Sequence, residues 1–270
     1  MIGPFPERAV SAELADEPRP TTVALESAIE RRWREAIATA ARDQRELFDG
    51  AVLRWLRHVV IAAQGGRRSL RLTVGRSTYR EFVGTNLNRD LVPDAPDPAG
   101  GPIPWSHFGN AVGTSALVAT PDAKLHLGRR SARVFGYSGH AHPFGGILES
   151  SDADACSVDL FSSMRRELTE ELALDHAQLH DLELTGAVVE PAFHQPELLF
   201  RLRVPLTSRE LEERFTAASS RHEHTCLVAL PDDEKAIEAA LERAAPVSPV
   251  GRACVALHFA AFARVEPVDR

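Results

Sequence analysis

The chain has 270 residues, 44% of them hydrophobic and 26% charged, which is enough apolar sequence for one large domain or two small ones with a sizeable core. A formal net charge of -7 disfavours a nucleic-acid-binding surface, although local arginines or a metal could hold a small anionic substrate. The odd number of widely spaced cysteines predicts free thiols in a reducing compartment, and the sequence shows no long apolar run and no signal-peptide core, so we expect a cytoplasmic protein without a membrane partner.

The first hundred residues predict a region of mixed secondary structure. Residues 1–22 are rich in proline and charge and are expected to be extended or weakly ordered. Residues 23–48 have helical spacing, residues 51–63 fit either a strand or a helix, and residues 69–75 alternate like a strand after a glycine turn. Ser77 is a candidate N-cap for a short helical turn that follows.

A proline- and glycine-rich segment, residues 92–104, is the best candidate for a domain boundary. Its alternative interpretation is a long surface loop within one domain. With a boundary near residue 100, residues 23–100 form an N-terminal α+β region and residues 101–270 form a second domain.

The second domain has strands and helices in mixed order, which is typical of an α/β fold. A loop over residues 131–146 ends in a Gly-Gly pair and precedes a strong helix within residues 157–174. Strands are expected over residues 111–120, 125–131, 182–190, 198–206 and 224–231, and further helices over residues 208–218, 233–245 and 251–265.

The helix within residues 157–174 combines an apolar stripe with an acidic face. Glu167, Glu170 and Glu171 have the i, i+3, i+4 spacing that puts side chains on one face of a helix. Like charges at this spacing each cost about a few tenths of a kcal/mol. Hard divalent cations prefer carboxylate, water and phosphate oxygens, so the cluster fits a metal site. The alternative is a solvated acidic face that Arg165 and Arg166 partly neutralise.

The stretch "FGGILE…RELTEELAL" resembles the Nudix box, G-x5-E-x7-R-E-U-x-E-E-x-G-U, in which U is an apolar residue. Two departures separate it from that pattern. Arg166 lies 20 positions after Gly146 instead of 14, so six extra residues fall within residues 150–157, and either Glu149 or Asp152 could stand for the first box glutamate. Ala173 replaces the box glycine, so the helix end need not adopt a left-handed cap. The second half matches at Arg166, Glu167, Leu168, Glu170, Glu171 and Leu174.

Scattered matches resemble the Nudix subgroup of UDP-sugar pyrophosphatases, which hydrolyse UDP-glucose and UDP-galactose to UMP and sugar 1-phosphate. They cover the chain from about residue 30 to residue 235. They are the expanded box, "LFSS" before its Arg-Glu, "LFDGA" at residues 47–51, "TYREFVGTN" at residues 78–86 and "GRRS" at residues 128–131.

The resemblance implies roles for the box residues. Glu167, Glu170 and Glu171 would bind divalent metal, magnesium or manganese, with the Gly145 carbonyl as a further ligand. Arg166 would orient the glutamates, and its position four residues before Glu170 allows the two to pair. Bound metal would neutralise the diphosphate and activate a water molecule for in-line attack on phosphorus.

Nudix enzymes often add a glutamate from a loop before a later strand, and Glu223 has that place in "RHEHTCLVAL". We therefore expect Glu223 to be a base or a metal ligand, with Glu190 and Glu197 as rival acids. The neighbouring His222 and His224 are interpreted as exposed loop histidines without a role.

Candidate substrate-binding residues lie in two clusters. Arg129, Arg130 and Arg133 precede the glycine pair and suit bidentate phosphate contact, or they protect an exposed strand edge. In the other cluster, Tyr79 or Phe82 could stack on a base and Asn86 could bind its edge, although such aromatic residues also serve as core. The three tryptophans, Trp33, Trp55 and Trp105, are interpreted as packing residues.

The expected fold is α/β, a Nudix α/β/α sandwich with a mixed sheet, joined to an α+β N-terminal region. The expected function is metal-dependent hydrolysis of a small-molecule nucleoside diphosphate, UDP-glucose or UDP-galactose. The alternatives are a Nudix pyrophosphatase for coenzyme A or ADP-ribose and a non-catalytic nucleotide-sugar sensor. The sequence leaves the oligomeric state open.

Overall fold

Two mixed β-sheets organise the chain in the computed structural model, which describes residues 1–43, 47–62, 68–88, 90–91, 103–132, 134 and 136–262. The larger sheet has the order β1-β10-β11-β5-β6-β12, with β7 paired to β6. Within it β11 and β5 run parallel, and the other neighbouring strands run antiparallel. Its strands are β1 (Ile2–Pro6), β5 (Gly113–Thr120), β6 (Lys124–Arg130), β7 (Ala141–His142), β10 (Leu182–Val189), β11 (Pro196–Arg203) and β12 (His224–Pro231).

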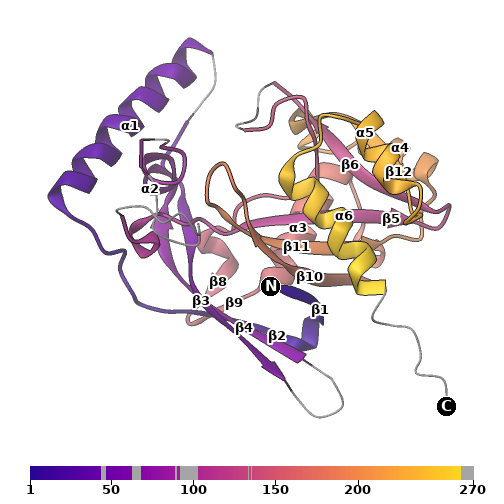
Figure 1. The fold of residues 1–270 in the computed structure, drawn as a ribbon, viewed down its shortest axis with the longest axis horizontal. Helices are drawn as coiled ribbons and strands as arrows, with labels where there is room; N and C mark the ends of the chain where they lie inside the picture. The colour runs from indigo at the N-terminus through magenta and orange to yellow at the C-terminus, as the bar shows by residue number, and fades with distance from the viewer. Residues whose placement is uncertain are drawn as a thin grey trace.

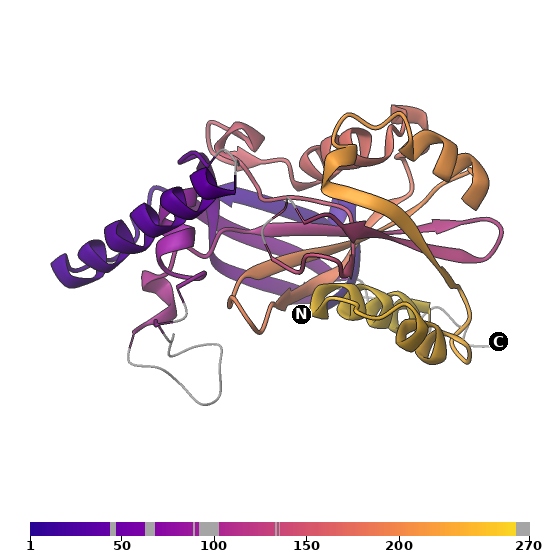
Figure 2. The ribbon, with the colours of Figure 1, turned by 90° about the horizontal axis from the view of Figure 1, so that it is seen from above.

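Helices cover both faces of this sheet (Figures 1 and 2). One face carries α3 (Leu160–Leu172) and α4 (Ser208–Phe215), and the opposite face carries α5 (Ile237–Arg243) and α6 (Pro249–Phe262). The first pair buries Phe161, Leu168 and Leu211, while the second buries Leu241 and residues of α6 against the other side of the sheet. The expected α/β/α sandwich with a mixed sheet is therefore confirmed.

The smaller sheet has the order β3-β4-β2-β9-β8 and lies beside the sandwich (Figure 1). Two helices, α1 and α2, pack on each other next to this sheet. Its strands are β2 (Val10–Leu14), β3 (Ala51–Ala62), β4 (Arg68–Thr78), β8 (Ala153–Asp154) and β9 (Ser157–Val158), and the helices are α1 (Val23–Arg42) and α2 (Tyr79–Gly84). Short 3-10 turns are Glu7–Ala9, Trp105–His107, Ser150–Asp152, His176–Gln178 and Arg221–Glu223.

The two sheets share one hydrophobic core. Leu72 of the smaller sheet, Phe200 of the larger sheet and Leu168 of α3 belong to the same cluster of buried side chains. The β8–β9 hairpin, which follows the glycine pair in sequence, extends the smaller sheet through β2. The glycine-loop segment is thus joined to the smaller sheet by strand pairing, while packing joins the two sheets.

Several local expectations are resolved by these elements. Residues 51–63, which fitted two structures, form strand β3 over Ala51–Ala62. Residues 1–22 are extended as expected, but they are not weakly ordered throughout, because β1 pairs with β10 and β2 pairs with β4. The proposed boundary at residues 92–104 falls mostly outside the described residues.

The N-cap of α2 is Thr78 rather than Ser77. The Thr78 hydroxyl accepts from the Glu81 amide at 3.3 Å, and the Glu81 carboxylate accepts from the Thr78 amide at 3.3 Å, which is a complete capping box. Ser77 instead donates its hydroxyl to Glu81 at 2.6 Å. Trp33 and Trp55 are buried and Trp105 packs against the core, as expected for packing residues.

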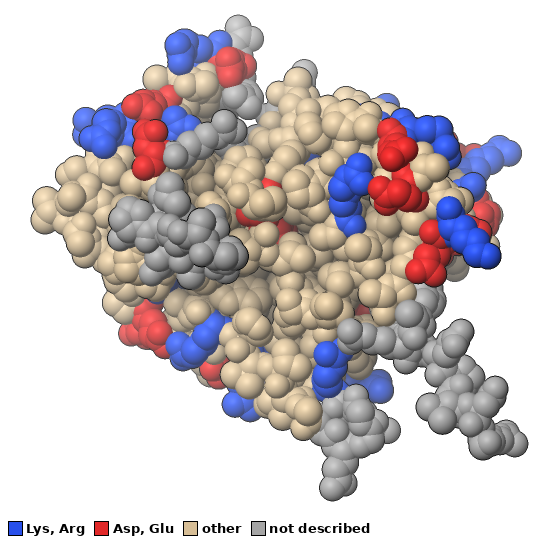
Figure 3. Space-filling view, in the orientation of Figure 1, with Lys and Arg blue, Asp and Glu red and all other residues tan. Residues whose placement is uncertain are grey.

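The surface carries charge in small mixed groups. On the face shown in Figure 3, Lys and Arg side chains lie beside Asp and Glu around the rim, and acidic atoms are visible in a hollow near the centre. The three cysteines are free, as predicted. Within the described part of the chain, every helix is too short or too polar to cross a bilayer.

Candidate functional site

Helix α3 carries the acidic cluster and is fixed in place by its N-cap and its apolar stripe. The Asp159 carboxylate accepts from the Ser162 amide at 2.9 Å and so caps the first turn. The stripe of Phe161, Met164, Leu168 and Leu172 is buried against the sheet. Because the helix cannot rotate without exposing this stripe, the directions of its glutamates are set by core packing.

Glu171 is buried instead of solvated, with 1% of its surface exposed. One carboxylate oxygen accepts from the Gly145 amide at 3.1 Å and lies 3.4 Å from Nε2 of His224. Burial, followed by the charges of Glu223 and Glu167, raises the pKa of Glu171 well above its ordinary value. The interpretation of this helix face as a solvated acidic surface is therefore wrong for Glu171.

The glycine loop is built to approach this helix closely. Gly145 has φ of +149°, and a Cβ there would collide with the Thr114 carbonyl, so only glycine fits. A Cβ on Gly146 would lie 2.9 Å from the Glu167 carboxylate. The Gly-Gly pair thus places the loop backbone directly against two of the box glutamates.

Arg166 organises the acidic cluster through residues of the expanded box. Its guanidinium forms an ion pair with Asp152 and donates to Glu167 at 3.0 Å. The expected pairing with Glu170 is not found, because the guanidinium is directed toward the loop that precedes the helix. Of the two candidates for the first box glutamate, Asp152 therefore takes the position beside Arg166.

Asp152 also holds the expansion itself together. One of its oxygens accepts from the Glu149 amide at 2.8 Å and from the Ser163 hydroxyl at 3.0 Å. The extra residues form the turn Ser150–Asp152 and the β8–β9 hairpin, which leaves the sandwich and joins the smaller sheet. The expansion is thus accommodated without displacing α3 from the glycine loop.

The end of α3 differs from expectation at Ala173. This residue adopts the left-handed conformation, with φ of 52° and ψ of 39°. With alanine in place of the box glycine, the sequence did not require this conformation. Its amide donates to Thr169 O at 2.9 Å, and the Thr169 hydroxyl donates to Leu174 O at 3.1 Å. The chain therefore keeps the glycine-type helix end with an alanine in it.

Glu223 ends the 3-10 turn Arg221–Glu223, directly before β12, and it lines the same cavity as Glu167 and Glu170. It is half-buried, and burial together with Glu170 raises its pKa, while His222 and Arg130 oppose the shift. His222 lines the same cavity as Glu223. His224 is not an exposed loop histidine, since it is buried against Gly128 and Phe144 beside Glu171. Burial lowers the pKa of His224 to about 4, so its ring is neutral near pH 7.

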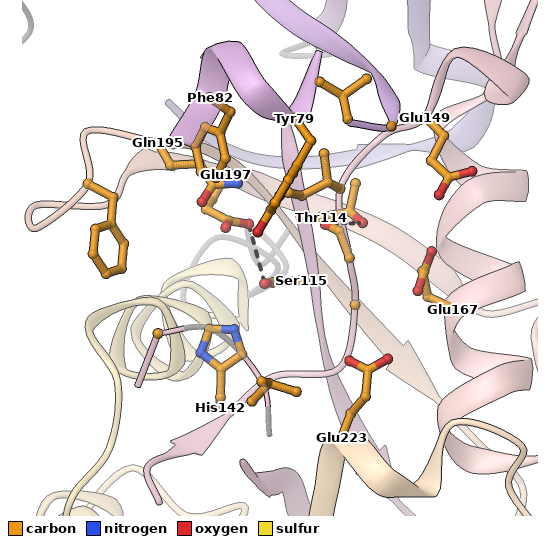
Figure 4. Close-up of a pocket in the computed structure, with 18 of the residues that line it drawn as sticks. Tyr79, Phe82, Thr114, Ser115, His142, Glu149, Glu167, Gln195, Glu197 and Glu223 are labelled. Atoms are coloured by element: carbon orange, nitrogen blue, oxygen red, sulfur yellow. Dashed lines mark hydrogen bonds between the residues drawn. The ribbon is translucent and has the colours of Figure 1, made fainter. Parts of the chain in front are cut away.

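A cavity of about 1060 Å³ lies between the sandwich and the N-terminal region. Glu167 and Glu223 lie on one side of it, and Phe82, Gln195 and Glu197 lie on the other (Figure 4). Glu170 also lines the cavity. Residues of the N-terminal region that line it include Leu47, Phe48, Val52, Tyr79, Phe82 and Leu87. Two parts of the chain that are distant in sequence thus form one site.

Arg130 lines the same cavity. Burial lowers its pKa, and the nearby Glu171, Glu223, Glu197 and Tyr79 oppose that shift. Its Nε donates to Gly136 O at 3.1 Å. This part-buried guanidinium therefore interacts with Glu171 and Glu223 as well as with Glu197.

Some of the other residues that were expected to bind substrate line the cavity, and others do not. Tyr79 and Phe82 line the cavity, with ring centroids 5.9 Å apart. Arg129 is directed away from the cavity and donates to backbone carbonyls, including Gly139 O at 3.0 Å and Ala244 O at 3.1 Å. Arg133 lies outside the described residues.

Asn86 does not line the cavity, because its amide is used within the fold. Its Nδ2 donates to Phe193 O at 3.1 Å and to His194 O at 3.2 Å, and its Oδ1 accepts from the Asn110 amide at 2.8 Å. Asn86 therefore ties α2 to the turn that carries Phe193. The expected role of Asn86 at a base edge is replaced by a role in positioning that turn.

Sequence reasoning missed several lining residues. Gln195, Phe193, Tyr137, His142 and Ser115 all face the cavity. A partial signal existed in "VVEPAFHQPE", where polar residues interrupt the join between two apolar strands. The rival acids Glu190 and Glu197 also line the cavity, and Glu190 accepts from Tyr137 Oη and from the Phe193 amide.

The carboxylates line a wall without converging on one point. Among the described residues, no three side chains of His, Cys, Asp or Glu form a ready-made metal site. The donor set nevertheless fits a hard divalent cation. Glu171 is buried, Glu167 and Glu223 are partly buried, and the charges of Glu167 and Glu223 both raise the pKa of Glu171. Positive charge placed among them would offset this repulsion.

Comparison with known proteins gives a weak match to a single superfamily. No family model matches the chain. Nudix hydrolase 9 of Arabidopsis thaliana is 23% identical over 239 residues, which cover 78% of this chain and 73% of that protein.

Solved structures resemble the chain only loosely. The DR0079 protein of Deinococcus radiodurans has a TM-score of 0.40 at 14% identity, covering 75% of this chain and 98% of its own. The ORF135 protein of E. coli has a TM-score of 0.35 at 21% identity, covering 59% and 94%. The Nudix hydrolase RenU of M. smegmatis has a TM-score of 0.33 at 16% identity, covering 60% and 89%. Likeness at these scores supports no conclusion about function.

The sequence similarity and the box residues point in the same direction. The chain shares 23% identity with Nudix hydrolase 9, and its glycine pair lies directly against glutamates of the helix that follows. The chain is thus similar in sequence to a Nudix hydrolase, and the residues that resemble the Nudix box lie together in space.

Proposed function

We propose that the protein hydrolyses the diphosphate bond of a nucleoside diphosphate sugar, with UDP-glucose or UDP-galactose as the expected substrate. Similarity to a Nudix hydrolase supports pyrophosphate hydrolysis in general. The observation that carries the finer proposal is a single cavity that is lined by carboxylates, by Arg130 and by aromatic side chains. A nucleoside diphosphate sugar combines a diphosphate, which metal-binding acids and an arginine can hold, with a base, which aromatic side chains can contact.

The size of the cavity fits a substrate of this class. Ligand pockets commonly measure about 300–1000 Å³, and this one is at the upper end of that range. Two rings from the N-terminal region, Tyr79 and Phe82, offer apolar surface to a base. A smaller diphosphate without a base would leave this part of the cavity unused.

The acidic end would carry the chemistry. Glu167, Glu170 and Glu171 would hold magnesium or manganese, which would neutralise the diphosphate and activate a water molecule for attack on phosphorus. Asp152 and Arg166 fix the Glu167 carboxylate in direction through the ion pair and the hydrogen bond described above. Arg130 provides a guanidinium for phosphate oxygens in the cavity.

Glu223 is the best placed residue to accept a proton. It lines the cavity opposite α3, and its raised pKa makes it a stronger base than an ordinary exposed carboxylate. His224 keeps its neutral ring against Glu171 and so supports that carboxylate without adding charge. Each of these groups acts on the reacting end of the cavity.

The test is product analysis by chromatography with magnesium on UDP-glucose, UDP-galactose, ADP-ribose, coenzyme A and a nucleoside triphosphate. Release of UMP and sugar 1-phosphate from the UDP-sugars alone is the expected result. Cleavage of a different diphosphate would retain the pyrophosphatase chemistry and overturn the substrate. Tight binding of a UDP-sugar without any cleavage would indicate a sensor and overturn the enzymatic proposal.

A further inference from the structure

The end of the cavity that lies away from the metal-binding acids carries two polar side chains that the proposed reaction does not use. Gln195 and Glu197 lie at the start of β11 and line the cavity beside Tyr79 and Phe82 (Figure 4). Gln195 is 9% exposed, and within the described residues its side-chain amide makes no hydrogen bond. An amide that lines a cavity and has no partner in the fold is available to a ligand.

The Glu197 carboxyl group occupies space that a glycine leaves free on the neighbouring strand. In the parallel pairing of β11 with β5 it lies opposite Gly113, and a Cβ at Gly113 would collide with its carboxylate. Its described side-chain hydrogen bond is a long one, in which the Ser115 hydroxyl donates to Oε2 at 3.4 Å. The missing Cβ at position 113 makes room for a carboxyl group inside the sheet, and the second oxygen, Oε1, remains for a ligand.

The charge state of Glu197 suits a neutral ligand. Burial raises its pKa to about 8, with Glu190 adding to the shift and Ser115 and Arg130 opposing it. Burial raises the pKa of the Cys254 thiol on α6, and the charge of Glu197 adds to that shift. Near pH 7 the carboxyl is therefore mostly protonated and presents both a hydrogen-bond donor and an acceptor.

Flat aromatic surfaces flank these two polar groups. Tyr79 and Phe82 come from α2, while Phe193 lies on the turn before β11, with its ring centroid 5.7 Å from that of Tyr137. Asn86 fixes this turn by bonding to the carbonyls of Phe193 and His194. Rings beside a paired donor and acceptor match the two faces and the edge of a nucleobase.

We propose that Gln195 and Glu197 form a subsite that reads the hydrogen-bonding edge of an uncharged base, while Tyr79, Phe82 and Phe193 contact its faces. The base is that of the nucleotide substrate, so this inference rests on the proposed function. Glu197 donates to a ring carbonyl or ring nitrogen, and the Gln195 amide accepts from the adjacent N–H. The acidic end of the cavity then receives the diphosphate through Arg130.

The experiment compares Glu197→Met, which keeps length but removes hydrogen bonding, with Glu197→Gln, which keeps a neutral donor and acceptor. The kcat/KM is measured for UDP-, CDP-, ADP- and GDP-glucose, and for UDP-galactose. In Glu197→Met and in Gln195→Leu the ratio between the best and the worst base is expected to fall by about tenfold. In Glu197→Gln that ratio stays within about threefold of wild type, and melting curves confirm that each variant is folded.

Sugar selectivity is the internal control. The UDP-glucose to UDP-galactose ratio is expected to stay unchanged in all three variants. A change in this ratio, with base selectivity intact, would assign the subsite to the sugar and overturn the proposal. Unchanged base selectivity in both Glu197→Met and Gln195→Leu would overturn it as well.

Binding without turnover separates this inference from the proposed reaction. Calorimetry with UMP is expected to show about tenfold weaker binding to Glu197→Met than to wild type, while binding of inorganic diphosphate stays the same. If wild type cleaves no nucleotide sugar but this difference in UMP binding holds, the reaction is wrong and the base subsite stands. If cleavage occurs and UMP binding is equal in both proteins, the subsite is wrong and the reaction stands.

Discussion

Helices α1 and α3 both combine an apolar stripe with many glutamates and arginines, but their charged side chains differ in how far they are buried. On α1, Arg34 pairs with Glu30 at 2.8 Å, with 75% of the arginine side chain and 42% of the glutamate side chain exposed. On α3, Glu171 is almost completely buried, and Arg166 is engaged by Asp152 and Glu167. Charge on a helix is thus ordinary at a surface and becomes informative when tertiary packing buries it.

The difference has a simple physical origin. The charged side of α1 faces solvent, where an ion pair is screened and contributes little. Glu167 and Glu171 of α3 lie against the glycine loop, where burial makes their carboxylates costly to ionise. Such an arrangement reduces stability, and it is retained where the carboxylates have chemistry to perform.

The largest expected effect follows from removing charge on α3. Glu170→Gln and Glu171→Gln should each reduce hydrolysis by about a hundredfold or more, since both carboxylates are proposed to hold the metal. Glu171→Gln should leave the melting temperature unchanged or raise it, because a neutral amide replaces a buried acid among acids. Steady-state rates and thermal unfolding without added metal measure both outcomes.

The matched control is Glu213→Gln on α4, which removes an exposed glutamate that pairs with Arg209 at 3.0 Å. This variant should keep wild-type rates. Near-wild-type hydrolysis by both α3 variants would refute the metal-site assignment.

A smaller effect is expected at Asp152, the acid that links the box expansion to α3. Asp152→Asn weakens the pair with Arg166, so kcat should fall by roughly tenfold to a hundredfold, as for residues that orient metal ligands. The free energy of unfolding should fall by about 1–3 kcal/mol. Glu149→Gln, one alternative for the same box position, is the comparison variant, and an equal loss of kcat in it would contradict the assignment of Asp152.

Glu197 extends the comparison to a buried acid on a strand. Because its folded-state pKa of about 8 lies above the ordinary 4.5, its contribution to stability is fully present below about pH 4.5 and is lost as the pH rises through about 8. The slope in that window is at most about 1.4 kcal/mol per pH unit. The free energy of unfolding, measured by urea titration from pH 5 to pH 9, should fall more steeply with pH for wild type than for Glu197→Gln. Parallel curves for the two proteins would contradict a buried acid at this position.

A gain in stability is expected at the end of α3. Ala173 has a left-handed backbone, which costs an L-residue about 1–2 kcal/mol and which glycine adopts without strain. Glycine also makes the unfolded chain more flexible, and this offsets part of the gain. Ala173→Gly should therefore raise the free energy of unfolding by about 0.5–1 kcal/mol, measured by urea titration. Ala38→Gly, at an exposed position inside α1, should instead lower it by about 1 kcal/mol.

The smallest effect is expected for the charges of α1. Arg34→Gln removes an exposed i,i+4 pair, so the free energy of unfolding should change by less than about 0.5 kcal/mol and hydrolysis should stay the same. The change should also shrink as salt is added. A tenfold loss of activity would show that α1 contributes to the site and would remove the contrast between the two helices.

The sequence by itself determined the local structure and the chemistry of the acidic helix. Periodicity predicted α3, the flanking strands and the covering helices, because side-chain alternation and helical spacing are local properties. The box spacing placed Glu167, Glu170 and Glu171 on one face, and the loop position of Glu223 brought it to the same cavity.

Tertiary structure decided everything that depends on contacts between distant segments. Asp152 rather than Glu170 pairs with Arg166, His224 is buried beside Glu171, and Asn86 holds a turn instead of a ligand. The cavity is assembled from α2, β5, α3 and the turn before β11, which lie far apart in the chain. Which polar group faces that cavity depends on three-dimensional packing, and no spacing within a single segment encodes it.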